Sequence, residues 1–215
     1  MSSAAKSQGG SSVVHMRRFA PGFLISVLFL SFISGARAAE QLSAPGGGSE
    51  SADTLVSLSA PGVSVAAVGD VMMVGAALPV ILERGSDYPF DSTRSILQSA
   101  DFTVANLEAP FGACGKPFRK TYTFRVPPAF APALASAGFD AFTLANNHIL
   151  DYGTSTFFTT LRLLDSLGVA GFGAGPDRDS AEAGVRVVRN GWTAAFLGFS
   201  LTYPEQFWAD RKSVV

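Results

Sequence analysis

Short apolar runs that end in turn residues, separated by helical patterns, constrain the fold of this chain most. Three such runs are residues 63–68, 102–105 and 140–145. Runs of this length and composition are typical of buried strands. Four other segments carry apolar side chains at helical spacing: residues 76–83, 91–99, 129–137 and 154–167. Strands that alternate with helices predict an α/β fold with helical crossovers.

Local signals add detail to this alternation. Asn190-Gly191 is a strong hairpin turn, which predicts paired strands at residues 185–189 and 194–199. Asp91 is expected to cap the predicted helix at residues 91–99 at its N-terminus. Residues 169–172 and 122–125 are expected to form short strands, the latter inside the loop-rich segment 109–128.

The first 39 residues have the pattern of an export signal. Arg17 and Arg18 precede an apolar run at residues 22–33, and Ala36-Arg37-Ala38 matches the A-x-A cleavage pattern. The apolar run has about a dozen residues, fewer than the roughly 20 of a transmembrane helix. We therefore expect a signal peptide at residues 1–39 and export to the periplasm, cell envelope or medium. An uncleaved N-terminal membrane anchor is the alternative.

Composition places the folded part after a linker and excludes some functions. Residues 40–62 are rich in Gly, Ser and Pro, as flexible linkers are, so the domain is expected at residues 63–215. Beyond Ala39 the chain has 12 basic and 17 acidic residues. This acidic balance argues against nucleic acid as a partner. Cys114 is the only cysteine, which excludes an internal disulfide and a multi-cysteine zinc site.

Polar side chains follow the three predicted strands. Asp70 follows the first strand, Asn106 and Glu108 the second, and Asn146-Asn147-His148 the third. Since sites in open α/β sheets gather at the carboxyl ends of strands, these residues are expected to converge. Oxygen and imidazole donors suit Mn²⁺, Mg²⁺, Fe²⁺ or Zn²⁺. Each segment alone is more typical of a turn, a cap or a hydrogen-bonded structural histidine, and only their placement at three strand ends favours a shared site.

Three motifs resemble the CapA family of capsule and poly-γ-glutamate biosynthesis proteins. The motifs are residues 68–75 (VGDVMMVG), 105–109 (ANLEA) and 144–153 (LANNHILDYG). The similarity runs from about residue 63 to 203, and the third motif is its most specific part. The CapA family in turn resembles calcineurin-like metallophosphoesterases. The resemblance therefore implies a four-layer α/β/β/α sandwich with two divalent metal ions, of Mn, Fe or Zn.

The resemblance also assigns roles to residues. It implies that Asp70, Glu108 and Asn147 are metal ligands, with Glu108 in the position of the bridging acidic ligand. His148 would act beside the metals on a phosphate-like oxygen or a leaving group. Asn106, Asn146 and Asp151 are expected to support the site or contact the substrate. Asp151 lies three residues after His148 and is expected to orient its ring.

The sequence departs from this pattern in two places. Met72 occupies the position where metallophosphoesterases commonly have the histidine of an Asp-x-His motif. The later histidine-containing motifs of the family would follow residue 215, and no histidine follows His148. We therefore expect a domain truncated at its C-terminus, with at most half of the metal site.

The resemblance implies an exported protein of capsule or poly-γ-glutamate biosynthesis that acts as a metal-dependent, phosphoesterase-like hydrolase. Expected partners are an anionic polymer or a phosphate-containing substrate, and a membrane synthase complex. The alternatives are a non-enzymatic polymer-binding or scaffold protein of such a complex, and an inactive fragment. The basic residues of the long loop either contact the anionic substrate or are simply solvated; they are Lys116, Arg119, Lys120 and Arg125.

Overall fold

The computed structural model describes residues 62–201 and 204–207. The predicted signal peptide at residues 1–39 and all of the predicted linker except Gly62 lie outside these residues. Within the described ranges, no helix combines the length and the apolar character that a membrane crossing requires.

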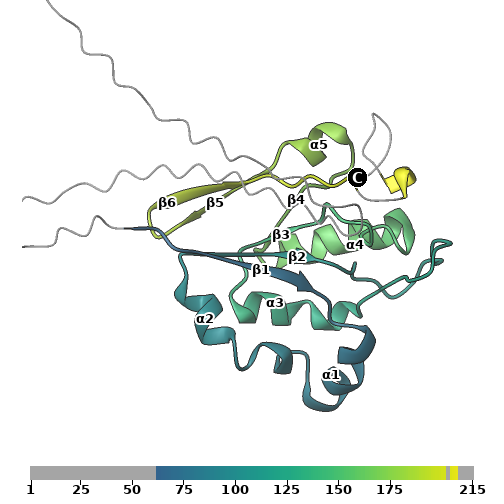
Figure 1. Ribbon diagram of the computed structural model, residues 1–215, viewed down its shortest axis with the longest axis horizontal. Helices are drawn as coiled ribbons and strands as arrows, with labels where there is room; N and C mark the ends of the chain where they lie inside the picture. The colour runs from purple at the N-terminus through teal and green to yellow at the C-terminus, as the bar shows by residue number, and fades with distance from the viewer. Residues whose placement is uncertain (1–61, 202–203, 208–215) are drawn as a thin grey trace, which may run out of the picture.

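Four parallel strands form the main sheet, in the order β1-β2-β3-β4 (Figure 1). The strands are β1 (Val65–Val71), β2 (Phe102–Leu107), β3 (Ala141–Thr143) and β4 (Ala170–Phe172). The α-helices of the crossovers are α1 (Leu78–Arg84), α2 (Arg94–Ser99), α3 (Pro132–Ala137) and α4 (Gly153–Ser166). Short 3-10 helices are η1 (Gly75–Ala77), η2 (Tyr88–Phe90), η3 (Pro128–Phe130) and η4 (Glu205–Phe207). The predicted alternation of strands and helices is confirmed.

The alternation of side chains along β2 shows that the sheet is covered on both faces at this strand. Ala105 and Leu107 belong to a core shared with the helices, which includes Leu134 of α3 and Phe157 of α4. Successive side chains of a strand point to opposite faces. Every residue of β2 is buried, as expected for a strand between two covered faces.

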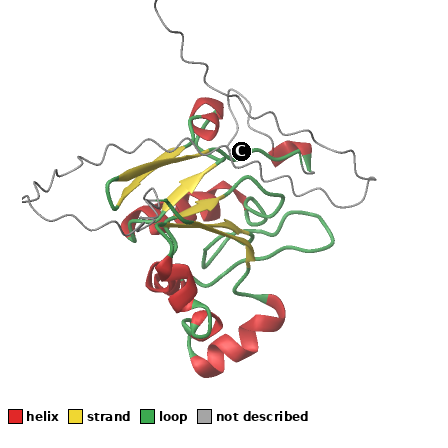
Figure 2. Cartoon of the chain, turned by 60° about the vertical axis from the view of Figure 1, so that its left-hand side comes forward, coloured by secondary structure: helices red, strands yellow, loops and turns green. Residues whose placement is uncertain are grey.

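A second, two-stranded sheet covers the other face. It is the hairpin β5 (Val185–Arg189) and β6 (Trp192–Phe196), which follows the short helix α5 (Arg178–Glu182). Phe102 and Val104 of β2 pack with Ala194 and Phe196 of β6 in a separate apolar cluster. Figure 2 shows the two sheets together, with helices gathered beneath the main sheet. The α/β class is confirmed, and the layer order follows the α/β/β part of the predicted sandwich.

Two glycines let the hairpin approach the main sheet. Gly173 follows β4 with a φ of +78°, and a Cβ atom there would lie 2.9 Å from the Cα of Gly198. A Cβ atom on Gly198 would lie 2.7 Å from the side-chain oxygen of Thr143. Any side chain at either position would force the two segments apart, because real Cβ atoms do not approach other atoms so closely.

Some local predictions were wrong. Asp91 does not cap α2: the helix begins after Thr93, and Asp91 instead lies 3.5 Å from the guanidinium of Arg94. The segment 122–125 is not a strand, because the amide of Phe124 donates to the carboxylate of Asp151 rather than to a neighbouring strand. Helix α5 was not predicted, although Asp177 caps it by accepting from the amide of Ser180.

Candidate functional site

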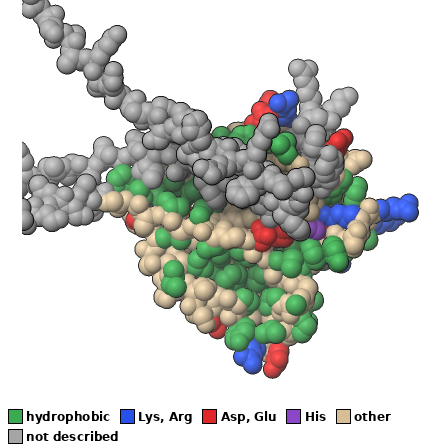
Figure 3. Space-filling view, in the orientation of Figure 1, with side chains coloured by type: hydrophobic (Ala, Val, Ile, Leu, Met, Phe, Trp, Pro, Cys, Tyr) green, Lys and Arg blue, Asp and Glu red, His purple; other side chains and the backbone are tan. Residues whose placement is uncertain are grey.

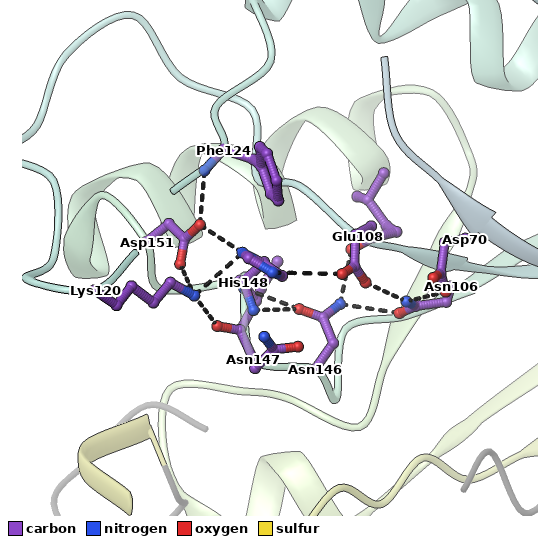
Figure 4. Close-up of polar contacts among 11 residues, drawn as sticks. Asp70, Asn106, Glu108, Lys120, Phe124, Asn146, Asn147, His148 and Asp151 are labelled. Atoms are coloured by element: carbon purple, nitrogen blue, oxygen red, sulfur yellow. Dashed lines mark hydrogen bonds and ion pairs between the residues drawn. The ribbon is translucent and has the colours of Figure 1, made fainter. Parts of the chain in front are cut away.

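The carboxyl ends of β1, β2 and β3 bring the predicted site residues together (Figure 4). Asp70 lies within β1, where an irregular register after Ala67 sets it beside Asn106 of β2. Glu108 follows β2 directly, and residues 146–148 follow β3 after a short connection. Since parallel strands end at the same edge of their sheet, side chains from three separate segments share one place.

Asn106 links the two carboxylates of this cluster. Its side-chain Nδ2 donates to Asp70 Oδ1 at 2.8 Å and to Glu108 Oε2 at 2.7 Å. Its Oδ1 accepts from the side-chain Nδ2 of Asn146 at 2.9 Å. Asn106 is 4% exposed, so these hydrogen bonds fix both the amide and the two carboxylates that it holds.

Burial and a neighbouring charge both perturb the carboxyl group of Glu108. Its pKa is raised above the ordinary value, first by burial and then by the negative charge of Asp70. Electrostatic interactions with His148 and Lys120 and the hydrogen bond from Asn106 oppose this rise. Two carboxylates on one amide repel each other, and a bound cation would relieve that repulsion.

His148 faces Glu108 with one ring nitrogen and Asp151 with the other. Nε2 lies 3.6 Å from Glu108 Oε1, and Nδ1 lies 2.7 Å from Asp151 Oδ2. The ring of Phe124 packs on the imidazole at a centroid distance of 4.6 Å. Asp151 is fully buried, and its Oδ2 also accepts from the Phe124 amide at 2.7 Å. The expected contact between Asp151 and His148 is therefore present.

The two neighbouring asparagines differ in what they do. Asn146 is buried, and its Oδ1 accepts from the amides of His148 and Ile149, both at 2.9 Å. Asn146 therefore shapes the turn that carries His148 and does not contribute a free oxygen. Asn147 is half-buried, and its side-chain amide makes no hydrogen bond within the described part of the chain. Its amide oxygen remains available for a ligand.

Lys120 joins the site, although its sequence context does not distinguish it from the other basic residues of its loop. Its Nζ lies 2.5 Å from Asp151 Oδ1 and 2.5 Å from the backbone oxygen of Asn147. Figure 3 shows acidic, histidine and basic side chains side by side on this face. No sequence signal could have found this contact, because it depends on how the loop between β2 and α3 folds over the third motif.

The donors at this edge fit part of a divalent cation site. Asp70, Glu108 and Asn147 supply oxygen, which suits hard divalent cations, and His148 Nε2 lies beside them. Across residues 62–201 and 204–207, no three side chains of the types His, Cys, Asp and Glu are grouped closely enough to hold a metal ion. The proposed ligand set therefore depends on the amide of Asn147.

Comparison with known proteins gives a consistent result. The bacterial capsule synthesis protein family PGA_cap matches residues 64–214. The capsule biosynthesis protein CapA of Bacillus anthracis is 28% identical over 150 residues, which cover 65% of this chain and 36% of that protein. The PGA biosynthesis protein CapA of Bacillus subtilis (strain 168) is 28% identical over 154 residues, 70% of this chain and 40% of that protein.

A third relative is a probable polyglutamine synthesis accessory protein of Mycobacterium tuberculosis, strain H37Rv. It is 32% identical over 132 residues, which cover 58% of this chain and 34% of that protein. The chain thus spans between about a third and two fifths of the length of these three relatives.

Proposed function

The chain belongs to the bacterial capsule synthesis protein family PGA_cap, and we propose from that premise that it acts in capsule or poly-γ-glutamate biosynthesis. Two similar proteins carry capsule or PGA biosynthesis in their names, which supports the proposal. Deleting the gene from its host should reduce the capsular or polyglutamate polymer at the cell surface. An unchanged polymer yield would contradict this role.

The proposed chemistry is metal-assisted, phosphoesterase-like hydrolysis. The observation that carries it is that Asn106 holds Asp70 and Glu108 together beside His148. Asp70, Glu108 and Asn147 would hold the divalent cations, Mn, Fe or Zn. Such ions supply Lewis-acid charge and lower the pKa of bound water when they are present.

His148 would act on the substrate through Nε2. Asp151 holds the opposite nitrogen, which leaves Nε2 directed to the edge where Glu108 lies. From this position Nε2 can take up a proton and then pass it to a leaving oxygen. Phe124 packs against the ring at an interplanar angle of 45°.

The substrate would be an anionic polymer or another phosphate-containing molecule. Of the four basic residues in the long loop, Lys116 and Arg119 are exposed. Arg125 lies over the ring of Tyr152, with 4.3 Å from its guanidinium carbon to the ring centroid. The ammonium of Lys120 is already paired with the carboxylate of Asp151. Lys116 and Arg119 are therefore the residues that we expect to attract a polyanion.

We also propose that the protein is exported, on the basis of its N-terminal sequence. Cleavage after Ala38 would place it in the periplasm, in the cell envelope or outside the cell. N-terminal sequencing of the exported protein should then begin near Ala39 or Glu40. An intact residue 1–38 segment on detergent-extracted protein would instead show a membrane anchor.

One observation favours a second candidate function. The described residues lack a group of three His, Cys, Asp or Glu side chains able to hold a metal. A non-enzymatic protein would then use the same edge and the basic loop to bind an anionic polymer or to support a membrane synthase complex. Intact metal binding without turnover, or polymer binding without metal, would favour this function.

Metal analysis and a phosphodiesterase assay on the full chain distinguish the two functions. Asp70→Ala and Glu108→Ala should each lose most of the bound Mn²⁺, Fe²⁺ or Zn²⁺, because each removes a charged oxygen donor. His148→Ala should keep its metal while turnover falls by about 10²–10⁴-fold. Asp165→Ala, which removes an exposed carboxylate of α4, is the matched control. Unchanged metal content in both carboxylate variants would refute the site.

A further inference from the structure

We propose that Lys120 is a positioning residue that fixes the orientation of the His148 imidazole. It would do so by holding Asp151 and the backbone of Asn147. The importance of this role for catalysis rests on the proposed function, whereas the contacts of Lys120 do not depend on that function. Lys120 comes from the loop between β2 and α3, whereas its partners lie between β3 and α4. The contact therefore joins segments that are separated by almost thirty positions.

The ammonium of Lys120 is surrounded by acceptors. Its Nζ lies 2.5 Å from Asp151 Oδ1, 2.5 Å from the Asn147 carbonyl oxygen and 3.1 Å from His148 Nδ1. The side chain is 18% exposed. Holding a lysine side chain in one conformation costs rotamer freedom. The contacts with these three acceptors offset this loss of side-chain entropy and hold Lys120 in place.

Asp151 needs this cation. The side chain is fully buried, and Oδ2 already accepts from His148 Nδ1 and from the amide of Phe124. Oδ1 is buried too and makes no hydrogen bond of ordinary geometry among the described residues, so the Lys120 ion pair is what compensates its charge. An unpaired buried carboxylate would be strongly unfavourable.

The same contacts select one tautomer of His148. Nδ1 lies within reach of a carboxylate, which only accepts, and of an ammonium, which only donates. It cannot satisfy both at once. The Asp151 contact is shorter, at 2.7 Å against 3.1 Å, and the ammonium has two closer acceptors. Nδ1 therefore carries the proton and donates it to Asp151.

This tautomer leaves a lone pair on Nε2. Glu108 Oε1 lies 3.6 Å from Nε2, which is too long for a hydrogen bond. Among the described residues, Nε2 thus has no hydrogen-bond partner at the edge of the sheet where Asp70 and Glu108 lie. Without Lys120, Oδ1 of Asp151 would have no partner among the described residues, so the carboxylate could turn and release Nδ1. The ring would then be free to exchange tautomers.

Nitrogen NMR of the histidine ring tests this role directly. The chain has two histidines, so ¹⁵N-histidine labelling of the full chain gives two ring systems, and His15→Gln identifies the signals of His148. With a chelator present, we expect wild-type His148 to show well-separated Nδ1 and Nε2 resonances, as one fixed tautomer does. Lys120→Met should move the two resonances toward a common averaged value.

Matched variants separate positioning from loss of charge or of fold. Lys116→Met removes the same charge from an exposed position of the same loop and should leave the His148 resonances separated. Separated resonances in folded Lys120→Met protein, or averaged ones in the wild type, would overturn the proposal. If Lys120→Met does not fold, Lys120→Arg decides: it keeps the charge and the donors, so separated resonances support the proposal and averaged resonances overturn it.

The measurement does not depend on the proposed function. A single fixed tautomer of His148 in a protein without hydrolytic activity would refute the proposed hydrolysis and leave the role of Lys120 intact. Averaged His148 resonances in a protein with hydrolytic activity would refute the role of Lys120 and leave the proposed hydrolysis intact.

Discussion

Replacing Asn106 with alanine should strongly destabilise the metal-free protein. The amide donates one hydrogen bond to Asp70 and one to Glu108, at 2.8 and 2.7 Å. Hydrogen bonds to charged groups contribute about 1.5–3 kcal/mol each. Asp70 is exposed, so its bond lies at the low end of that range. We expect a loss of about 3–5 kcal/mol in the free energy of unfolding.

Two further effects of Asn106→Ala act in the same direction. The hydrogen bond from Asn106 lowers the pKa of Glu108, so its loss raises that pKa further. The two carboxylates would also face each other without the amide between them. Asn146 loses one acceptor but keeps the carbonyl oxygen of Leu107, at 2.8 Å, so its own cost is small.

Asn147→Ala is the matched control for this experiment. It removes a neighbouring amide whose side chain makes no hydrogen bond in the described part of the chain. Its expected cost is within about 0.5 kcal/mol. The assay is urea unfolding of the full chain with a chelator present, with unfolding monitored by circular dichroism. A loss below about 1 kcal/mol for Asn106→Ala, or one equal to that of Asn147→Ala, would refute the reasoning.

Three other predictions concern pH and packing. The pKa of Glu108 in the folded protein is raised above its reference value of 4.5. The metal-free protein should therefore lose stability as the pH rises from 4.5 to the folded-state pKa of Glu108. Glu108→Gln should flatten this pH dependence of stability in urea titrations. Asp151→Ala should cost about 3–5 kcal/mol because it leaves the Lys120 ammonium half-buried and unpaired, and Lys120→Met on that background should recover stability. Phe142→Ala should cost about 3–5 kcal/mol by calorimetry, because its ring is fully buried.

The hydrophobic pattern was enough to predict the main sheet. Each apolar run became a parallel strand, and the helical patterns between them became crossover helices. The Asn190-Gly191 turn also formed as predicted, with positive φ at both residues. These elements are local, so their sequence signals do not depend on distant contacts.

The sequence could not predict features that depend on long-range contacts. Asp70 was expected after its strand, but pairing with Asn106 extends β1 past it. The loop around Phe124 was expected to hold a strand, but Asp151 takes up its amide. Lys120 is one of several basic residues in its loop, and only the fold places it against a buried carboxylate. In each case a partner far along the chain decides the outcome.

The central claim is that Asp70 and Glu108 form one cation site at the carboxyl end of the sheet. Crystals of the full chain soaked in Mn²⁺, measured by anomalous diffraction, test it most directly. We predict an anomalous peak between these two side chains, within about 2.5 Å of an oxygen atom from each, and with the Asn147 amide turned toward it. A crystal that binds Mn²⁺ elsewhere, or shows no peak at this edge at saturating Mn²⁺, would contradict the account.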